Sequence, residues 1–590
     1  MNVRERASSS FSASGLSGSL VLLALLAADI LLGRFETAVL ALVGMTIGTV
    51  LLLGAAGLRL GRKRSSEASS GLKGLELVLA IGCAGFTVAR GWVCFEGPTV
   101  DAVLLGARVE AGRLYDLAFT AFLVAGDLAL WRAPLLSRAV RALASRPPLV
   151  LAVAFAVMIG LGTTALCLPW SVRGLHDVSF LDSLFTMTSA VCVTGLAVND
   201  VGTHYTTFGQ VVILLGIQAG GIGIMTLGAA AIAMGRDTAL RTQARFALVH
   251  ETESLRELRS IVRTVIGSTL VIETIGAILL AIAWRDVPAL EGRSVGWCAA
   301  FHSISAFCNA GFTLFPDSLG RFTGDVATQS VIMALIVLGG LGFPVYLELF
   351  RRLRERLPQW LGGVSGVRRR LGLEVRVVLA TSAVLLLAGA LVAVVLEWGR
   401  AFDSLTALER VLAGTFASVS ARTAGFATID VGTLRSTTWI VLMVLMWIGA
   451  SPSSTGGGIK TSAAAVLFAV FVGELRGHPP RLALRALGAS TVRRAIVVAL
   501  ASLAVFTMVT LGLTLTDDQP PLALAFEAMS ALTTTGLSTG ITAAVSDAGR
   551  LLLVVAMFLG RLGPVTVALA VGGTQRRERF ALPTQELQVW

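Results

Sequence analysis

Long apolar stretches alternate with short polar segments along the whole chain. A helix needs roughly 20 apolar residues to cross the ~30 Å hydrocarbon core of a bilayer. Twelve stretches have about that length, four before Pro147 and eight after it. They cover about 16–33, 37–58, 75–95, 117–131, 149–168, 209–234, 264–284, 328–350, 376–396, 437–472, 495–515 and 549–571. This pattern predicts an all-α polytopic membrane protein.

Composition agrees with a membrane protein. Hydrophobic residues make up 55% of the 590 residues and charged residues 14%, whereas a soluble globular domain carries about 25% charged residues. Soluble, disordered, collagen-like and disulfide-rich proteins are therefore excluded. The six cysteines show no paired ligand spacing, so we expect no disulfide and no metal role for them. The charged N-terminus before an apolar run also fits a signal peptide, but without a cleavage motif a first transmembrane helix is favoured.

The positive charge is placed in the loops. The net charge of +12 invites a nucleic-acid interpretation, but the basic stretches lie between apolar runs and carry no interleaved aromatic residues. With the N-terminus inside, 33 Lys and Arg fall in cytoplasmic segments and 12 in outer segments. By the positive-inside rule both termini are cytoplasmic, and we expect a multi-pass protein of the plasma (inner) membrane. Arg90, Lys460 and Arg561 stand inside apolar segments.

An internal repeat lies in the outer connections. Half-length apolar stretches cover 180–200, 297–319, 407–430 and 522–542, and each contains a glycine with a serine five to eight residues before it. The four glycines, Gly195, Gly311, Gly425 and Gly536, are 116, 114 and 111 residues apart. Each is followed by a Gly-rich segment (218–228, 338–348, 449–463 and 559–569), where we expect a helix break. A helix, a half-helix with a glycine loop and a kinked helix thus recur four times.

Such a unit suits a pore. Non-helical backbone at membrane depth is tolerated where it lines an aqueous cavity or is buried in protein, and glycine reaches positive φ without a Cβ clash. Four glycine loops around one axis form rings of carbonyl oxygens that replace the hydration shell of a cation. The C-terminal dipole ends of the half-helices favour positive charge at the same centre. We therefore predict four pseudo-symmetric repeats around one pore.

Six motifs of this chain resemble those of a known family of membrane proteins. They are SAVCVTGL (189–196), SAFCNAGF (305–312), SVSARTAGF (418–426), ALTTTGLSTG (531–540), QAGGIGIMT (218–226) and STGGGIK (454–460). The stretch from about Leu149 to Gly572 resembles the ion-translocating subunit of the Trk/Ktr/HKT superfamily of potassium transporters. The resemblance implies four pseudo-repeats in one chain, a potassium filter with a glycine in every repeat, a homodimer, and a cytoplasmic ring of nucleotide-binding (RCK-type) gating subunits.

The resemblance also implies roles for individual residues. The filter residues would act mainly through backbone carbonyls, and the only metal would be K⁺ in this filter. The filter set is Val193, Thr194, Gly195, Asn309, Ala310, Gly311, Thr423, Ala424, Gly425, Thr534, Thr535 and Gly536. The alternative is that these are small residues that only pack helices.

An intramembrane gate is implied beneath this filter. Gly456, Gly457, Gly458 and Lys460 match the family's intramembrane loop, and Arg561 matches its arginine in the last kinked helix. A lysine at membrane depth is costly unless it is solvated or paired, so it is a functional candidate, although a lysine at a helix end can also reach the interface. Arg561 either tunes cation passage, which we favour, or pairs with an acid. Arg422 is interpreted as a structural anchor for the third loop.

These assignments divide the chain into six parts. They are an N-terminal accessory transmembrane region (1–147), pore repeat 1 (148–235), pore repeat 2 (236–351), pore repeat 3 with the gating loop (352–475), pore repeat 4 (476–575) and a cytoplasmic C-terminal tail (576–590). For the first part we expect a peripheral packing or dimer-contact role.

The predicted function is potassium uptake driven by the membrane potential, with sodium as a second candidate ion. The alternatives are a proton- or sodium-coupled solute transporter with inverted repeats and a membrane-bound enzyme. Few acids lie within spans (Asp29, Glu76, Asp127 and Glu273) and they form no repeated pattern, and the five histidines are scattered. We therefore predict no enzyme.

No cofactor is expected in this chain, because it lacks a GxGxxG motif after a strand. ATP/ADP or NAD is expected only on a partner subunit. The basic loops at 235–263, 351–376 and 473–494 are predicted to dock that subunit, and the alternative is contact with anionic membrane lipids. No nucleic-acid partner is expected.

Overall fold

The computed structural model describes residues 147–240, 251–349, 352 and 371–563, apart from short gaps at 169, 174–178, 288–289, 291 and 484. The predicted accessory region before Pro147 and the C-terminal tail (576–590) lie outside the described residues. The same holds for most of the basic loop at 351–376 and for part of the one at 235–263. The description below therefore concerns the part of the chain that carries the four glycine motifs.

One order of elements occurs four times: a long helix, a short helix, a loop and a further helix. We refer to these as groups 1 to 4. Group 1 contains α6 (Pro147–Leu166), α7 (Phe180–Val191), α8 (Val201–His204) and α9 (Thr207–Leu240). Group 2 contains α10 (Glu251–Ala283), α11 (Val295–Cys308), η2 (Gly320–Phe322) and α12 (Val326–Leu341), which is followed by a helix over Phe343–Leu349.

Groups 3 and 4 continue the order. Group 3 contains α14 (Leu373–Glu397), α15 (Ala407–Ala421), η3 (Val431–Thr433), α16 (Ser436–Trp447) and α17 (Thr461–Leu475). Group 4 contains α18 (Ala489–Thr516), α19 (Pro521–Leu532), η4 (Thr542–Ala544) and α20 (Asp547–Leu562). Between them, β1 (Arg481–Leu482) and β2 (Arg485–Ala486) pair as a small antiparallel hairpin.

Several helices have the length and composition of membrane spans. Within the described residues, Val262–Ala283, Leu373–Glu397 and Ala489–Thr516 qualify, and Val326–Leu341 with Phe343–Leu349 qualifies as a bent pair. Further apolar helical stretches of 10 to 17 residues lie in this part of the chain, among them Ala152–Leu166 of α6 and Thr207–Gly223 of α9. Exposed leucine, valine and isoleucine side chains on α10, α14 and α18 form the apolar exterior that a bilayer requires.

The short helices have defined beginnings. The Ser179 side chain caps α7, and Thr406 and Glu409 form a reciprocal capping box at the start of α15. The backbone amide and the hydroxyl of Thr406 both donate to the Glu409 carboxylate at 2.8 Å. These hydrogen bonds hold the pKa of Glu409 below its usual value. These caps fix where α7 and α15 start, and hence where their C-terminal ends lie.

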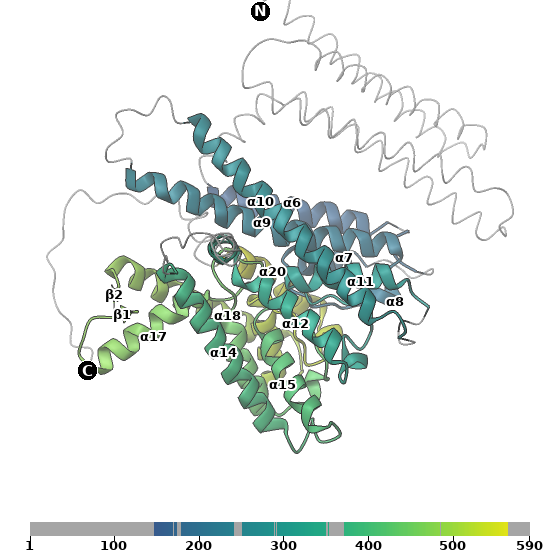
Figure 1. Cartoon of the computed structure of the whole chain (residues 1–590). Helices are drawn as coiled ribbons and strands as arrows, with labels where there is room; N and C mark the ends of the chain where they lie inside the picture. The colour runs from purple at the N-terminus through teal and green to yellow at the C-terminus, as the bar shows by residue number, and fades with distance from the viewer. Residues whose placement is uncertain are drawn as a thin grey trace, which may run out of the picture. The chain divides into compact units, whose positions relative to one another are not determined.

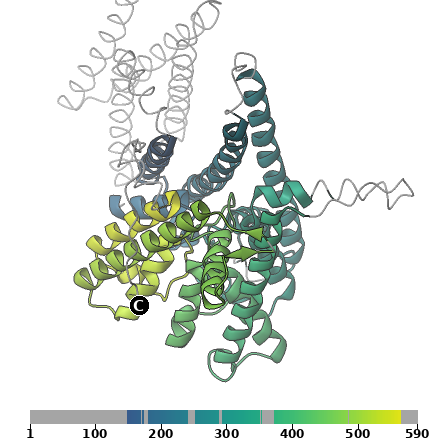
Figure 2. The same cartoon turned by 90° about the vertical axis from the view of Figure 1, so that its left-hand side faces the viewer.

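The four groups close into a cycle. Each short helix packs on helices of its own group and also on the helix that follows the loop in the neighbouring group: α11 on α9, α15 on α12, α19 on α16 and α7 on α20. Figures 1 and 2 show the blue and teal helices of groups 1 and 2 lying side by side, consistent with the contact between α9 and α10. The last contact, between α7 and α20, joins the first group to the fourth.

Two of the four predicted helix breaks are confirmed within the described residues. The chain bends by 100° between α12 and Phe343–Leu349, where Gly342 has φ 82°. The long apolar stretch at 437–472 is divided into α16 and α17 by the non-helical segment 448–460. In group 4, α20 ends at Leu562 and Gly563 has φ 84°, and the rest of that motif lies beyond the described residues.

The break predicted at 218–228 is wrong, because α9 runs through it without interruption. Its glycines serve close packing. A Cβ on Gly220 would overlap the backbone carbonyl of Val191, and a Cβ on Gly221 would lie 2.7 Å from the Cys308 sulfur. Small residues here let α9 approach the ends of α7 and α11, and that requirement is independent of helix breaking.

Candidate functional site

The four predicted glycines meet in one ring. All four have positive φ: 98° at Gly195, 70° at Gly311, 79° at Gly425 and 91° at Gly536. A Cβ on each glycine would lie 3.0 Å from the Cα of the next, in the order Gly195, Gly311, Gly425, Gly536 and back to Gly195. It would also strike the carbonyl oxygen of the residue before that next glycine. Only glycine fits at these positions, both for its φ and for the space around it.

The residues before the glycines also share a backbone conformation. Two positions earlier, Val193, Asn309, Thr423 and Thr534 have φ of 57°, 59°, 74° and 49°. Left-handed residues other than glycine are uncommon, and a valine or threonine in this region is strained. In each loop, two residues with positive φ flank one central residue. Because the same strained conformation recurs in all four loops, the surrounding structure enforces it. An alternation of positive and negative φ turns successive carbonyls toward the same side of the chain.

A serine braces each loop from the end of its short helix. The amide of the residue before each glycine donates to the serine carbonyl, at 2.7 to 2.9 Å. The side chains of Ser189 and Ser530 accept from the amides of Gly195 and Gly536, both at 3.0 Å. The hydroxyls of Ser305 and Ser420 donate to the carbonyls of Phe312 and Phe426, at 2.8 and 2.5 Å.

Electrostatics around the ring favour a cation. The helices α7, α11, α15 and α19 all end one to three residues before the loops, so their negative dipole ends face the ring region. The side-chain oxygens of Thr194, Thr423 and Thr534 are buried without a hydrogen-bond partner. Oxygen atoms without a donor, next to a ring of backbone carbonyls, are suitable ligands for a hard cation. No group of three or more His, Cys, Asp or Glu side chains in the described part of the chain could hold a metal ion.

The segment 448–460, which we call the intramembrane loop, lies against this ring. A Cβ on Gly456 would overlap the Thr423 side chain, and one on Gly457 would overlap the Thr534 side chain. The Thr455 hydroxyl donates to the Phe307 carbonyl at 3.3 Å. The predicted gate glycines Gly456 and Gly457 and the predicted filter residues Thr423 and Thr534 are thus direct neighbours.

The buried Arg422 and Arg561 and the half-buried Lys460 all bind backbone carbonyls. Arg561 donates to Thr455 O and, at 2.9 Å, to Gly220 O, so it joins the intramembrane loop to α9. Lys460 Nζ donates to Gly456 O at 2.7 Å. Arg422 donates to Gly449 O at 3.1 Å and to Ser382 O at 3.5 Å. None of the three forms an ion pair within the described ranges.

Two buried acids near the loops were not singled out as site residues from the sequence. Glu273 accepts from the Gln218 side-chain amide at 2.9 Å. Its Oε1 lies 3.8 Å from the sulfur of Cys308, the residue directly before the second loop. Glu527, on α19, is fully buried and binds the segment that follows Gly536. The signal that locates Glu527 is its place three residues before the bracing serine. That register becomes meaningful only once the serines are known to hold the loops.

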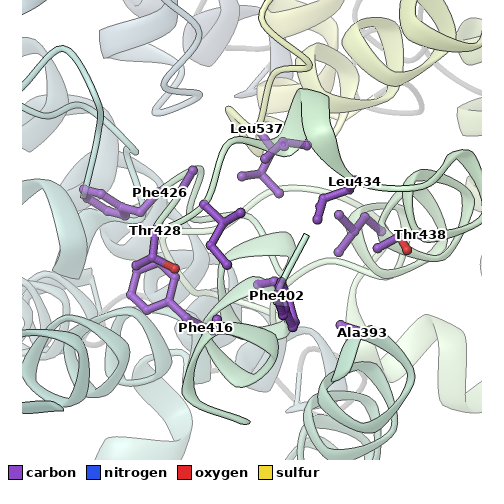
Figure 3. Close-up of a pocket in the computed structure, with 14 residues that line it drawn as sticks. Ala393, Phe402, Phe416, Phe426, Thr428, Leu434, Thr438 and Leu537 are labelled. Carbon is purple, nitrogen blue, oxygen red and sulfur yellow. The ribbon is translucent and has the colours of Figure 1, made fainter. Parts of the chain in front are cut away.

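A small, mostly apolar cavity lies behind the third loop. Figure 3 shows Phe402, Phe416, Phe426, Thr428 and Leu537 around it. Phe426 and Leu537 directly follow the glycines of groups 3 and 4. The cavity therefore borders two adjoining quarters of the ring.

Apolar spanning helices, four half-helices and a ring of backbone carbonyls define a membrane protein that passes cations. The chain matches the TrkH family of cation transport proteins over residues 132–574, and it belongs to this family. It is 33% identical to the Ktr system potassium uptake protein B of Bacillus subtilis over 434 residues, 73% of this chain and 94% of that protein. It is 36% identical to the protein of the same name from Vibrio alginolyticus over 409 residues, 69% of this chain and 87% of that one.

A solved structure has the same fold. The crystal structure of the potassium transporter TrkH from Vibrio parahaemolyticus aligns with a TM-score of 0.60 at 20% identity, over 84% of this chain and 96% of that one. The predicted family is thus confirmed. Because this family and these relatives are transport proteins, the prediction that the chain is not an enzyme also holds.

Proposed function

We propose that this chain takes up potassium through the ring of glycine loops, which acts as a selectivity filter inside four pseudo-symmetric repeats around one pore. The observation that carries the proposal is the closed cycle of four glycines, each at positive φ and each at the end of an inward-pointing half-helix. Backbone carbonyls of the residues around each glycine would replace the hydration shell that the cation loses on entry. The twelve filter residues predicted from the sequence are the proposed ligand-bearing set.

Potassium is proposed as the ion because of the relatives. Those from Bacillus subtilis and Vibrio alginolyticus are named potassium uptake proteins. A third, from Enterococcus hirae, is 30% identical over 457 residues and is named a potassium/sodium uptake protein. Sodium is therefore the second ion to be tested. A negative interior potential favours inward movement of a monovalent cation, by a free energy of about 2.3 kcal/mol per 100 mV.

We propose that the intramembrane loop is the gate. It lies against Thr423 and Thr534 of the filter, and the side chains of Lys460 and Arg561 donate to its carbonyls. Positive charge next to the cation path opposes conduction while the loop is in place. A glycine- and serine-rich segment between two helices is able to take a second position, which a gate requires.

Partners and orientation are part of the same proposal. Two relatives are named components of a "Ktr system", which supports a separate regulatory subunit. We propose that it is an RCK-type nucleotide-binding protein, docked on the basic cytoplasmic loops of a homodimer. Of these loops, 473–494 is described almost completely, and its Arg476, Arg481 and Arg485 are exposed. Both termini would then be cytoplasmic.

The test is rubidium and sodium uptake in cells that lack their own potassium uptake. The wild-type chain should restore growth at low potassium and take up Rb⁺ in preference to Na⁺. Gly311→Ser and Gly425→Ala should abolish the preference, because a side chain there meets the neighbouring loop and positive φ disfavours it by about 1–2 kcal/mol. Gly160→Ala is the matched control, since a Cβ at this α6 position meets no atom within 4 Å.

Two results would refute the proposal. One is a wild-type chain that reaches the membrane and takes up neither ion. The other is a Gly311→Ser or Gly425→Ala protein with the rate and ion preference of Gly160→Ala. Uptake of an organic solute driven by a proton gradient would instead support a secondary transporter.

A further inference from the structure

The four half-helices share a register that the glycine motif alone does not reveal. In each, a phenylalanine stands four residues before the bracing serine and an alanine directly follows the serine. All eight of these side chains are buried. The shared sequence F-x-x-x-S-A therefore aligns the half-helices residue by residue. The four phenylalanines are Phe185, Phe301, Phe416 and Phe526.

One position in this register differs in every group. Three residues before the serine stand Thr186, His302, Ala417 and Glu527. The three polar ones all bind a residue that follows the glycine loop. Thr186 accepts from the Tyr205 hydroxyl at 3.2 Å. His302 Nε2 accepts from the Leu314 amide at 3.4 Å, and Glu527 Oε1 accepts from the Thr539 amide at 3.0 Å.

The last two contacts are equivalent. Leu314 and Thr539 each stand three residues after the glycine of their own loop. A neutral imidazole and a carboxyl group thus perform the same task in groups 2 and 4, which is to hold the outer end of the loop from behind. The serine holds the same loop from its inner side, so the loop is fixed at both ends.

Group 3 supplies the natural counterexample. Its residue at this position, Ala417, lines the cavity behind the third loop together with Phe426 and Thr428. A cavity thus borders the position at which the other groups carry a larger polar side chain. The third loop nevertheless has the same positive φ at Thr423 and Gly425. A polar residue at this position is therefore not needed to form the loop.

Glu527 makes the most extensive of these contacts. Its Oε1 accepts from the Ser538 hydroxyl at 2.6 Å as well as from the Thr539 amide, and its Oε2 accepts from the Thr542 hydroxyl at 2.9 Å. All three donors lie in the six residues that follow Gly536. A buried carboxyl group is costly unless it is hydrogen-bonded, and here both oxygens are satisfied. This segment cannot move outward without breaking the set.

We propose that Glu527 is a positioning residue that fixes the outer end of the fourth loop and thereby sets the ion selectivity of the ring. The inference rests on the proposed function, since it concerns selectivity of the same ring. The physical link is that the number and spacing of carbonyl ligands distinguish K⁺ from Na⁺. A loop held only by Ser530 is free to adjust to the smaller ion.

The experiment compares three variants in cells without their own potassium uptake, with Rb⁺ and Na⁺ uptake measured per molecule in the membrane. Glu527→Ala removes all three hydrogen bonds, and we expect the Rb⁺/Na⁺ uptake ratio to fall by roughly fivefold or more, the equivalent of about one net hydrogen bond of positioning. Glu527→Gln retains an acceptor and is expected to lose less. Ser538→Ala removes one donor and should give an intermediate loss with an unchanged carboxyl group.

Glu397→Gln is the matched control. Glu397 is also a fully buried acid, and its Oε1 accepts from the Arg435 amide at 2.9 Å and from the Thr438 hydroxyl. It binds no residue within three positions of a ring glycine, so its loss should lower thermal stability and leave the Rb⁺/Na⁺ ratio unchanged.

A Glu527→Ala protein with wild-type Rb⁺/Na⁺ ratio and wild-type KM for Rb⁺ would overturn the inference. If Glu527→Ala does not reach the membrane, the other two variants decide: wild-type ratios in both Glu527→Gln and Ser538→Ala overturn it as well. A wild-type chain without Rb⁺ or Na⁺ uptake is a different failure. It would remove the proposed function, and this inference with it.

Discussion

Replacement of Arg561 by glutamine tests the proposed gate most directly. Arg561 is buried and donates to the carbonyls of Thr455 and Gly220, which belong to the intramembrane loop and to α9. Thr455 and Gly220 stand 106 and 341 residues before Arg561 in the sequence. The guanidinium group thus fastens the loop to a rigid helix of group 1. Glutamine is shorter and uncharged, and it cannot span both carbonyls.

The size of the effect follows from these contacts. A hydrogen bond from a charged donor contributes about 1.5–3 kcal/mol, and one such bond holds the loop itself. Its loss would favour the displaced loop by a factor of about ten to about one hundred, at about 1.4 kcal/mol per tenfold. Removal of a positive charge beside the cation path acts in the same direction. We therefore expect the Rb⁺ flux through the chain without its partner to rise at least about tenfold.

The assay is Rb⁺ uptake into proteoliposomes that contain the purified chain alone. Arg410→Gln is the matched control: Arg410, in the first turn of α15, also donates to three backbone carbonyls, but those of Leu405, Trp398 and Asp403 belong to the connection between α14 and α15. Its loss should lower the unfolding temperature without raising flux. A folded Arg561→Gln protein whose flux equals that of wild type and of Arg410→Gln would refute the role of Arg561 in holding a gate.

Three further outcomes are expected. Deletion of 453–457 should raise Rb⁺ flux and remove its response to a cytoplasmic partner or nucleotide, and unchanged flux with unchanged regulation would show that the loop is only a structural break. Gly220→Ala should impair Rb⁺/Na⁺ selectivity, because its Cβ overlaps a backbone carbonyl next to the first loop, whereas Gly267→Ala meets no atom within 4 Å and should behave as wild type. Thr328→Val leaves the buried Trp284 indole N–H, now bound at 2.8 Å, without an acceptor. It should cost about 1–3 kcal/mol of stability, seen as a lower unfolding temperature at unchanged selectivity.

Local sequence pattern was sufficient for the elements. Runs of apolar residues located the long helices, because a segment of that length can bury its backbone polar groups only as a helix. The four glycines were found from their spacing, and their positive φ follows from what glycine alone tolerates. The glycines and serines at 451–458 correctly indicated a break between α16 and α17.

The same reasoning failed where glycine has two uses. At 218–228 the pattern resembled that of a break, yet α9 is continuous there, and its glycines make room for the end of α7. A glycine that bends a helix and one that admits a neighbouring backbone look alike in one sequence. The neighbour that distinguishes them is known only from the fold.

Tertiary structure alone decided what surrounds the ring. The closure of Gly536 onto Gly195 and the reach of Arg561 to Gly220 each join residues more than 300 positions apart. The pairing of Glu527 with the segment after Gly536 depends on the exact direction in which a half-helix ends. Periodicity specifies which face of a helix is apolar, and glycine specifies where the backbone can turn. Which of many apolar faces pack together is set by the collective burial of all of them, and no short stretch of sequence contains that information.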